Sequence, residues 1–157
     1  MMEYSEKEIK AKLAELAKQQ GLKFRDEWPI YIRKQGGETW DDVEIARIDH
    51  AWYVEIEFNG ENLPLPVVAF EIVDMRKLLR LPELKKDLEN IRLSGAALGI
   101  LIIQAESEDA LSSYIRERLE RLYNIMRSLT HPVRVGVAYA GDVLQGRLPI
   151  KWLSTLY

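Results

Sequence analysis

Glu71 is the residue of this 157-residue sequence whose setting most needs a chemical explanation. It stands in VVAFEIV, residues 67–73, an otherwise apolar run that is typical of a strand covered on both faces. A carboxylate buried alone is unstable, so this acid needs a cation, a partner or a proton. Asp49, in RIDHAW, lies on the preceding predicted strand. Two acids on adjacent strands can share one divalent ion, so we interpret Asp49 and Glu71 as metal ligands and catalytic residues for phosphodiester hydrolysis.

The composition restricts the metal to a hard cation. The sequence has no cysteine and only two histidines, His50 and His131, which excludes thiolate zinc sites, iron–sulfur clusters and histidine-rich sites. The remaining oxygen ligands favour Mg²⁺ or Mn²⁺. By strand alternation His50 points away from the face of Asp49, so we expect it to pack or to form hydrogen bonds. His131, before Pro132, is expected in a turn.

A purely structural role for the two acids stays open. Asp49 and Glu71 could form ion pairs with Arg47 or with a helix lysine, and their spacing alone does not decide between this role and metal binding.

Other chemistries are excluded by missing motifs. The sequence has no Gly-rich phosphate loop ending in Lys-Ser, no dinucleotide-binding glycine pattern and no nucleophile elbow, so it does not match ATPases, dehydrogenases or serine hydrolases.

Hydrophobic periodicity and turn residues predict the elements that position these acids. Ser5 with Glu8 predicts a capped helix that ends at Gly21. Further helices are expected from Pro82 to Ser94-Gly95 and over residues 109–129. Strands are expected over residues 28–34, 43–58, 67–73, 98–105 and 133–140, with a hairpin turn at Asn59-Gly60. The order αβββαβαβ indicates one α/β domain over residues 1–157, with a sheet layered between helices.

This order, with acids on the second and third strands, resembles the PD-(D/E)XK nuclease superfamily. The strings RIDHAW and AFEIV are similar to its pattern, in which Ile-Asp precedes a tryptophan and a later strand carries Phe-Glu and an aliphatic residue. The resemblance covers residues 5–104. It implies a restriction-endonuclease-like, three-layer αβββαβ core with a central mixed sheet, here with an extra C-terminal helix and strand. It also implies Mg²⁺-dependent or Mn²⁺-dependent DNA cleavage, with the metal on Asp49, Glu71 and the Ile72 carbonyl.

The sequence departs from that family where its signature lysine usually stands. Val73 occupies this place, two residues after Glu71. Some members carry the lysine on the following helix, where this chain has Lys85 and Lys86. On a helical wheel Lys85 borders the sheet-facing stripe and Lys86 points away from it, so Lys85 is the third predicted catalytic residue. Its alternative is an ordinary solvated lysine.

Helix one and the surface charges add weaker indications. The family also uses an acid from its first helix, but the positions of Glu6 and Glu15 do not select either. The net charge of −3 gives no global attraction to nucleic acid, so binding would need a local patch. The best cluster by sequence contains Arg76, Lys77, Arg80, Lys85 and Lys86, and its alternative is a solvated face. The third helix is either ordinary core and surface or a homodimer face.

The sequence therefore predicts a metal-dependent endonuclease-like hydrolase that acts on DNA rather than RNA. Two alternatives remain. One is a non-catalytic module that keeps the fold to bind nucleic acid or protein, which Val73 and the negative charge favour. The other is an α/β domain of different ancestry with an ion-paired Glu71. No apolar run approaches the roughly 20 residues that cross a bilayer, and no secretory signal begins the chain. We expect a cytoplasmic protein without a membrane partner.

Overall fold

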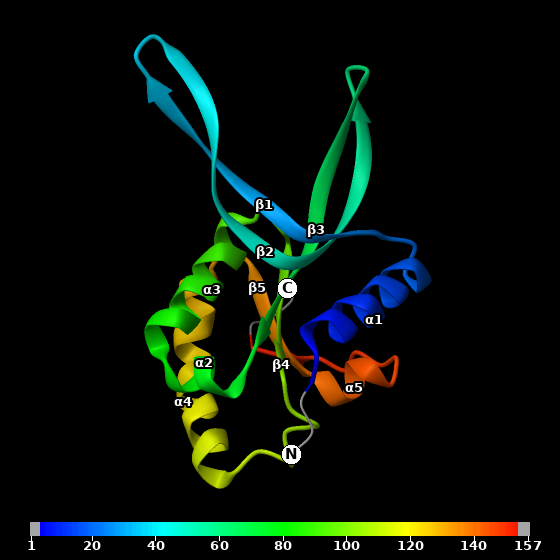
Figure 1. The fold of residues 1–157 in the computed structure, drawn as a ribbon, viewed down its shortest axis with the longest axis vertical. Coiled ribbons are helices and arrows are strands. Elements are labelled where there is room, and N and C mark those ends of the chain that lie inside the picture. The colour runs from blue at the N-terminus through cyan, green and yellow to red at the C-terminus, as the bar shows by residue number, and fades with distance from the viewer. Residues whose placement is uncertain (1–3, 154–157) are drawn as a thin grey trace.

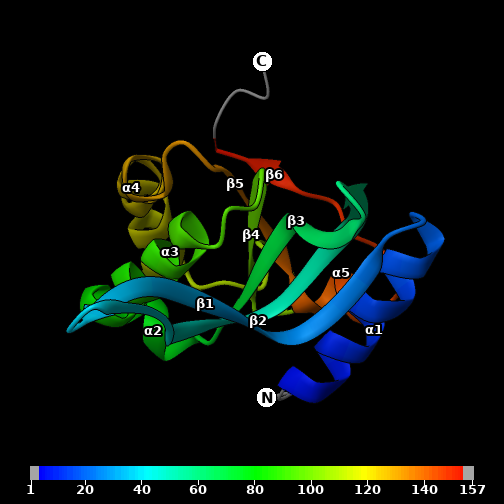
Figure 2. The same cartoon turned by 90° about the horizontal axis from the view of Figure 1, so that it is seen from above.

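The computed structural model describes residues 4–153, which form helices on both faces of one sheet (Figures 1 and 2). The first half contains α1 (Glu6–Gln19), β1 (Lys23–Gly36), β2 (Thr39–Phe58), β3 (Glu61–Val73), α2 (Met75–Leu79) and α3 (Leu81–Leu93). The second half contains β4 (Leu98–Ile103), α4 (Ser113–Thr130), β5 (Arg134–Tyr139), α5 (Ala140–Leu144) and β6 (Lys151–Trp152). This confirms the predicted α/β class with a mixed sheet.

The six strands follow one another across the sheet in chain order, from β1 to β6. The first three form an antiparallel meander, β4 and β5 run parallel to β3, and β6 returns antiparallel to β5. The parallel part is joined through helices, because parallel neighbours cannot be joined by a tight turn. Strand β3 therefore lies in the middle of the sheet, between an antiparallel and a parallel neighbour.

Two separate cores cover the two faces of the sheet. On the face of α1 and α5, Ile9 and Leu13 pack with Phe70 and Ile72 of β3. On the face of α3 and α4, Leu88 and Met126 pack with Ala69 and Val73 of the same strand. The two helix layers stand on opposite sides of the sheet in Figure 1. Because both faces are covered there, residues 67–73 of β3 and the whole of β4 are almost continuously apolar, as the sequence predicted.

The structure confirms several local sequence signals for caps and turns. The Ser5 hydroxyl accepts a hydrogen bond from the Glu8 N–H at 3.4 Å, which caps α1. Gly21 follows the helix with φ of 73°, a conformation that glycine adopts without strain. Asn59 and Gly60, with φ of 51° and 80°, form the predicted hairpin turn between β2 and β3.

Other predicted bounds are wrong. The first strand is twice as long as residues 28–34, and β3 begins at Glu61, so its prolines lie within the strand. The third predicted helix begins later than residue 109, because Ser112 caps α4. The short helices α2 and α5 and the two-residue β6 were not predicted, since such short elements show no measurable period.

The bend of β2 positions the candidate site. Strand β2 pairs with β1 from Thr39 to Tyr53 but with β3 only from His50 to Phe58. The hairpins β1–β2 and β2–β3 consequently diverge as two arms above the helices (Figure 1). Asp49 is the first residue of β2 beyond the β3 ladder, so its side chain lies where the two strands separate.

Candidate functional site

Asp49 and Glu71 meet at this separation. The Asp49 backbone N–H donates to Oε1 of Glu71 at 3.4 Å, and the Ile72 N–H donates to Oδ2 of Asp49 at 2.7 Å. Each strand thus offers a carboxylate to a backbone N–H of the other, in place of a ladder carbonyl. The structure brings together the two acids that the sequence placed on adjacent strands. The backbone carbonyl of Ile72, which the family resemblance implied as a further metal ligand, follows Glu71 directly on β3.

Burial makes this pair chemically unusual. Glu71 is only 2% exposed, and its burial, the charges of Asp49 and Asp87, and hydrogen bonding with Asp49 raise its pKa well above the usual value. Burial also raises the pKa of partly buried Asp49, although the Ile72 N–H opposes this shift. Two neighbouring acids that resist joint ionisation retain a proton unless a cation replaces it. The pair is therefore suited to exchange a proton for a cation.

Lys77 is a lysine whose charge acts on both of these acids. Its ammonium lies 3.0 Å from Oδ2 of Asp87 on α3, and its charge lowers the pKa of both Asp49 and Glu71. Burial alone would lower the pKa of Lys77, but its bond to Asp87 and the nearby acids raise it, so the ammonium stays charged. By sequence, Lys77 is recognisable only as part of a basic cluster. The sequence signal that could have identified the short helix carrying Lys77 was Asp74, whose side chain accepts from the Lys77 N–H at 2.9 Å and caps α2.

Lys85 lies elsewhere on its helix. It is exposed and lines a shallow hollow with Asn124, Ile125, Ser128 and Leu129 of α4. The structure therefore sets Lys85 against a neighbouring helix, and Lys77, rather than Lys85, is the lysine of the α2–α3 segment whose charge acts on both acids. The helical wheel located the edge of the apolar stripe correctly, but it carried no information about which element packs against that edge.

The basic cluster around these lysines is mostly neutralised by its own acids. Arg76 lies 3.4 Å from Asp74, and Arg80 lies 3.4 Å from Glu83. The Lys77 ammonium is bound to Asp87. The exposed Arg76–Asp74 and Arg80–Glu83 pairs add little stability, but all three pairs cancel charge locally. The surface of α2 and α3 is thus a mixed-charge face.

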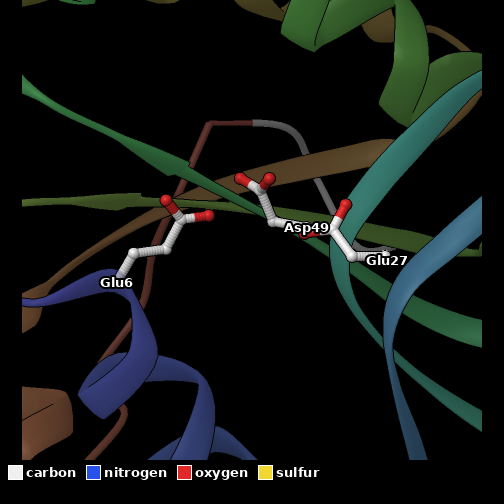
Figure 3. A group of neighbouring side chains, drawn as sticks. All are labelled: Glu6, Glu27 and Asp49. Atoms are coloured by element: carbon white, nitrogen blue, oxygen red, sulfur yellow. The ribbon is translucent and has the colours of Figure 1, made fainter.

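A second group of acids shares Asp49 from the solvent side. Glu6 of α1, Glu27 of β1 and Asp49 each offer one carboxylate oxygen, and these atoms lie within 4.8 Å of one another (Figure 3). Glu27 has a positive φ of 52°. Glu27 and Asp49 lie between the paired positions Asp26–His50 and Trp28–Ile48 of β1 and β2 and are not paired with each other in the ladder. The sequence missed Glu27 because this local irregularity is not visible in its pattern. Asp49 therefore joins a buried acid on one side to two exposed acids on the other.

A cationic side chain already lies between the exposed acids. The Lys10 ammonium is 2.7 Å from Oε1 of Glu27 and 3.4 Å from Oε1 of Glu6, while its own side chain is 15% exposed. This position shows that the group attracts and holds a positive charge. The ligand atoms that Asp49, Glu6 and Glu27 offer are all carboxylate oxygens, and such ligands suit Mg²⁺ or Mn²⁺.

His50 has a structural role, as the sequence predicted. It is completely buried, and its Nδ1 lies 2.6 Å from Oδ1 of Asp26. The Trp52 indole N–H donates to His50 Nε2 at 3.2 Å, so Nε2 must be an acceptor and Nδ1 must carry the proton. Burial lowers the pKa of His50, which favours this neutral form. His131 caps the C-terminal end of α4 and is exposed.

Comparisons with protein-family models, curated proteins and solved structures find no match to this chain. Within residues 4–153, no helix has the length and apolar character needed to cross a membrane.

Proposed function

We propose that this protein is a metal-dependent phosphodiester hydrolase that acts on DNA and has a PD-(D/E)XK-like core. The observation that carries the proposal is the meeting of Asp49 and Glu71 where β2 leaves β3. Their reciprocal bonds to backbone N–H groups fix two carboxylates at one point of the sheet. A structural ion pair would need a cation bound directly to Glu71, and within the described residues none lies within 4.0 Å of it.

The fold supports the proposal in three respects. A helix precedes an antiparallel meander of three strands, and α3 then leads to β4, which is parallel to β3. Helices cover both faces of the sheet, as the resemblance implies. The acids lie on the second and third strands of the meander. The extra helix and strand expected at the C-terminal side correspond to α4 and β5.

The proposed metal ligands are Asp49, Glu71 and the Ile72 carbonyl. A divalent ion bound there would polarise a phosphodiester and lower the pKa of water. Glu71 would release its proton when it becomes a ligand, and Asp49 would keep its bond to the Ile72 N–H. Glu6 and Glu27 approach the same aspartate from the solvent side, where they would orient water.

Lys77 is the residue proposed to stabilise the charge that develops on the phosphate. The strand position of the family lysine holds Val73, which is 0% exposed and belongs to the core under α3. Lys77 of α2 acts on both acids through its charge instead, and its bond to Asp87 holds the ammonium in place. A fixed cation next to a reacting phosphate contributes more than a mobile one, because it needs no reorganisation.

The alternative is a non-catalytic module with the same fold, which the buried Val73 and the net charge of −3 favour. A plasmid-nicking assay with Mn²⁺ separates the two. The proposal expects nicking by the wild type and none by Asp49→Asn or Glu71→Gln, with Glu57→Gln on the β2–β3 arm as an exposed control. An inert wild type supports the module. Equal nicking by all four proteins would identify a contaminating nuclease and remove the support for an enzyme.

A further inference from the structure

A groove of about 790 Å³ runs between α1 and β1 and opens at the acids of the candidate site. Glu6 and Glu27 line one end of the groove, and both belong to the carboxylate group around Asp49. Phe24 lines the groove farther along β1. The groove is therefore continuous with the proposed metal site, and a bound chain could lie in both.

One face of α1 presents lysines to this groove. Lys7, Lys10 and Lys18 all line it, and their spacing of three and eight residues places them on one side of the helix. The small residues Ala11 and Ala14 lie between them and leave room above the helix surface. Lys7 and Lys18 have no acidic partner within residues 4–153, whereas Lys10 is held by Glu6 and Glu27. Among the described residues, two ammonium groups without an acidic partner thus mark the two ends of this helix face.

The opposite wall of the groove offers an aromatic ring. Phe24 is partly exposed, and the Lys18 ammonium lies 5.8 Å from the centre of its ring. His50 stacks against Phe24 with the ring centres 5.8 Å apart, which fixes the ring's orientation. A lysine beside an anchored aromatic ring is the combination that binds a phosphate together with an unpaired base. A base inside a duplex is already stacked, so it cannot use such a ring.

The acids of the groove outnumber its lysines, so an anionic chain would be repelled from it in the absence of a metal ion. A divalent cation at the proposed site on Asp49 and Glu71 would offset this excess of negative charge, because Glu6 and Glu27 lie next to Asp49, and would weaken their hold on Lys10. Asp26 is already engaged by His50. The charge of the groove therefore depends on the occupancy of the metal site.

We propose that the α1–β1 groove holds a single polynucleotide strand, which runs from the carboxylates around Asp49 along Lys7 and Lys18 to Phe24, and that it does so only with a divalent ion bound. This inference rests on the proposed function and specifies that the groove holds an unpaired strand of the DNA substrate, such as one that opens locally in a supercoiled plasmid. Phosphates meet Lys7 and Lys18, and an unpaired base stacks near Phe24.

The test is fluorescence anisotropy with a labelled single-stranded oligonucleotide, in Ca²⁺ and in EDTA, over a range of salt. We expect binding in Ca²⁺ only. Lys7→Ala/Lys18→Ala should reduce the salt slope of log K by roughly 1.4, since each lysine contributes about 0.7 on a single strand. The matched control is Arg80→Ala/Lys86→Ala, which removes two exposed cations of the α2–α3 face and should leave the slope unchanged.

A second variant tests the ring without changing charge. Phe24→Leu should weaken binding by about fivefold or more at every salt concentration while the slope stays constant. Equal binding in EDTA, an unchanged slope in Lys7→Ala/Lys18→Ala, or tighter binding of a duplex competitor would each overturn the proposal. A metal-dependent nicking activity that survives these results would leave the proposed function intact, because only the strand path would be wrong. Loss of both strand binding and metal-dependent nicking would remove the proposed function as well.

Discussion

Lys77 and Asp87 form an ion pair 3.0 Å long that joins the short helix α2 to α3 beside the candidate site. Asp87 is 8% exposed and its burial raises its pKa, but the ammonium of Lys77 opposes that shift. The pair holds the lysine near enough to Asp49 and Glu71 for their charges to raise its pKa. A cation thus acts on the two acids although the strand carries no lysine.

Replacement of Lys77 should therefore impair phosphodiester cleavage. Lys77→Ala should slow Mn²⁺-dependent nicking by about 100-fold or more, the usual effect of removing one group that stabilises transition-state charge. Lys86→Ala, an exposed lysine of α3, is the control and should leave the rate unchanged. The assay is the initial rate on supercoiled plasmid. Loss of nicking in Lys85→Ala but not in Lys77→Ala would instead support the assignment made from the sequence.

The buried proton of Glu71 should appear in the pH dependence of stability. Its folded pKa lies above the ordinary value of 4.5, so the folded protein binds this proton more tightly than the unfolded chain. The resulting contribution to the free energy of unfolding is present below pH 4.5 and is lost as pH rises through the folded pKa. Urea denaturation at pH 5 and pH 8 should show a larger loss for the wild type than for Glu71→Gln.

Glu57→Gln, which changes an exposed glutamate on the β2–β3 arm, is the control and should behave as the wild type. Addition of Mn²⁺ at pH 8 should restore much of the lost stability to the wild type, since a cation replaces the proton. The same pH dependence in Glu71→Gln and wild type would mean that Glu71 has an ordinary pKa in the folded protein and carries no buried proton.

The hydrogen bond between Trp52 and His50 gives a prediction about stability alone. His50→Leu removes the acceptor of a buried indole N–H and should lower the free energy of unfolding by about 2 kcal/mol. The exposed histidine provides the control, and His131→Gln should change stability by about 0.5 kcal/mol or less. In a double-mutant cycle by urea denaturation, His50→Leu and Trp52→Phe together should cost less than the sum of the two. Strict additivity would show that the bond contributes nothing.

The sequence predicted the part of the site that depends on strands. Glu71 was recognisable because a charged residue interrupted an apolar run, and Asp49 followed from the hairpin between the two strands. Their adjacency is a consequence of antiparallel pairing, which a sequence can indicate. The two cores on opposite faces of β3 were also readable, because a strand covered twice has no polar face.

The residues that the sequence could not assign depend on tertiary contacts or on local irregularities. Lys77 lies on a five-residue helix that has no period, and its direction is set by Asp87 ten residues later. The carboxylate of Glu27 lies close to that of Asp49 at a point where the backbone of β1 has a positive φ. Lys85 lies exposed on the edge of α3 next to α4, and a helical wheel does not contain that neighbour. Side chains brought together by different elements are therefore the least predictable part of the site.

The position of a bound metal ion tests the central claim most directly. A crystal soaked in Mn²⁺ should show an anomalous peak in contact with carboxylate oxygens of Asp49 and Glu71, with the Ile72 carbonyl as a third protein ligand. The same soak of Glu71→Gln should lose the peak or reduce its occupancy strongly. No peak at Asp49, or a peak bound only by Glu6 and Glu27 and equally strong in Glu71→Gln, would contradict the proposed metal site.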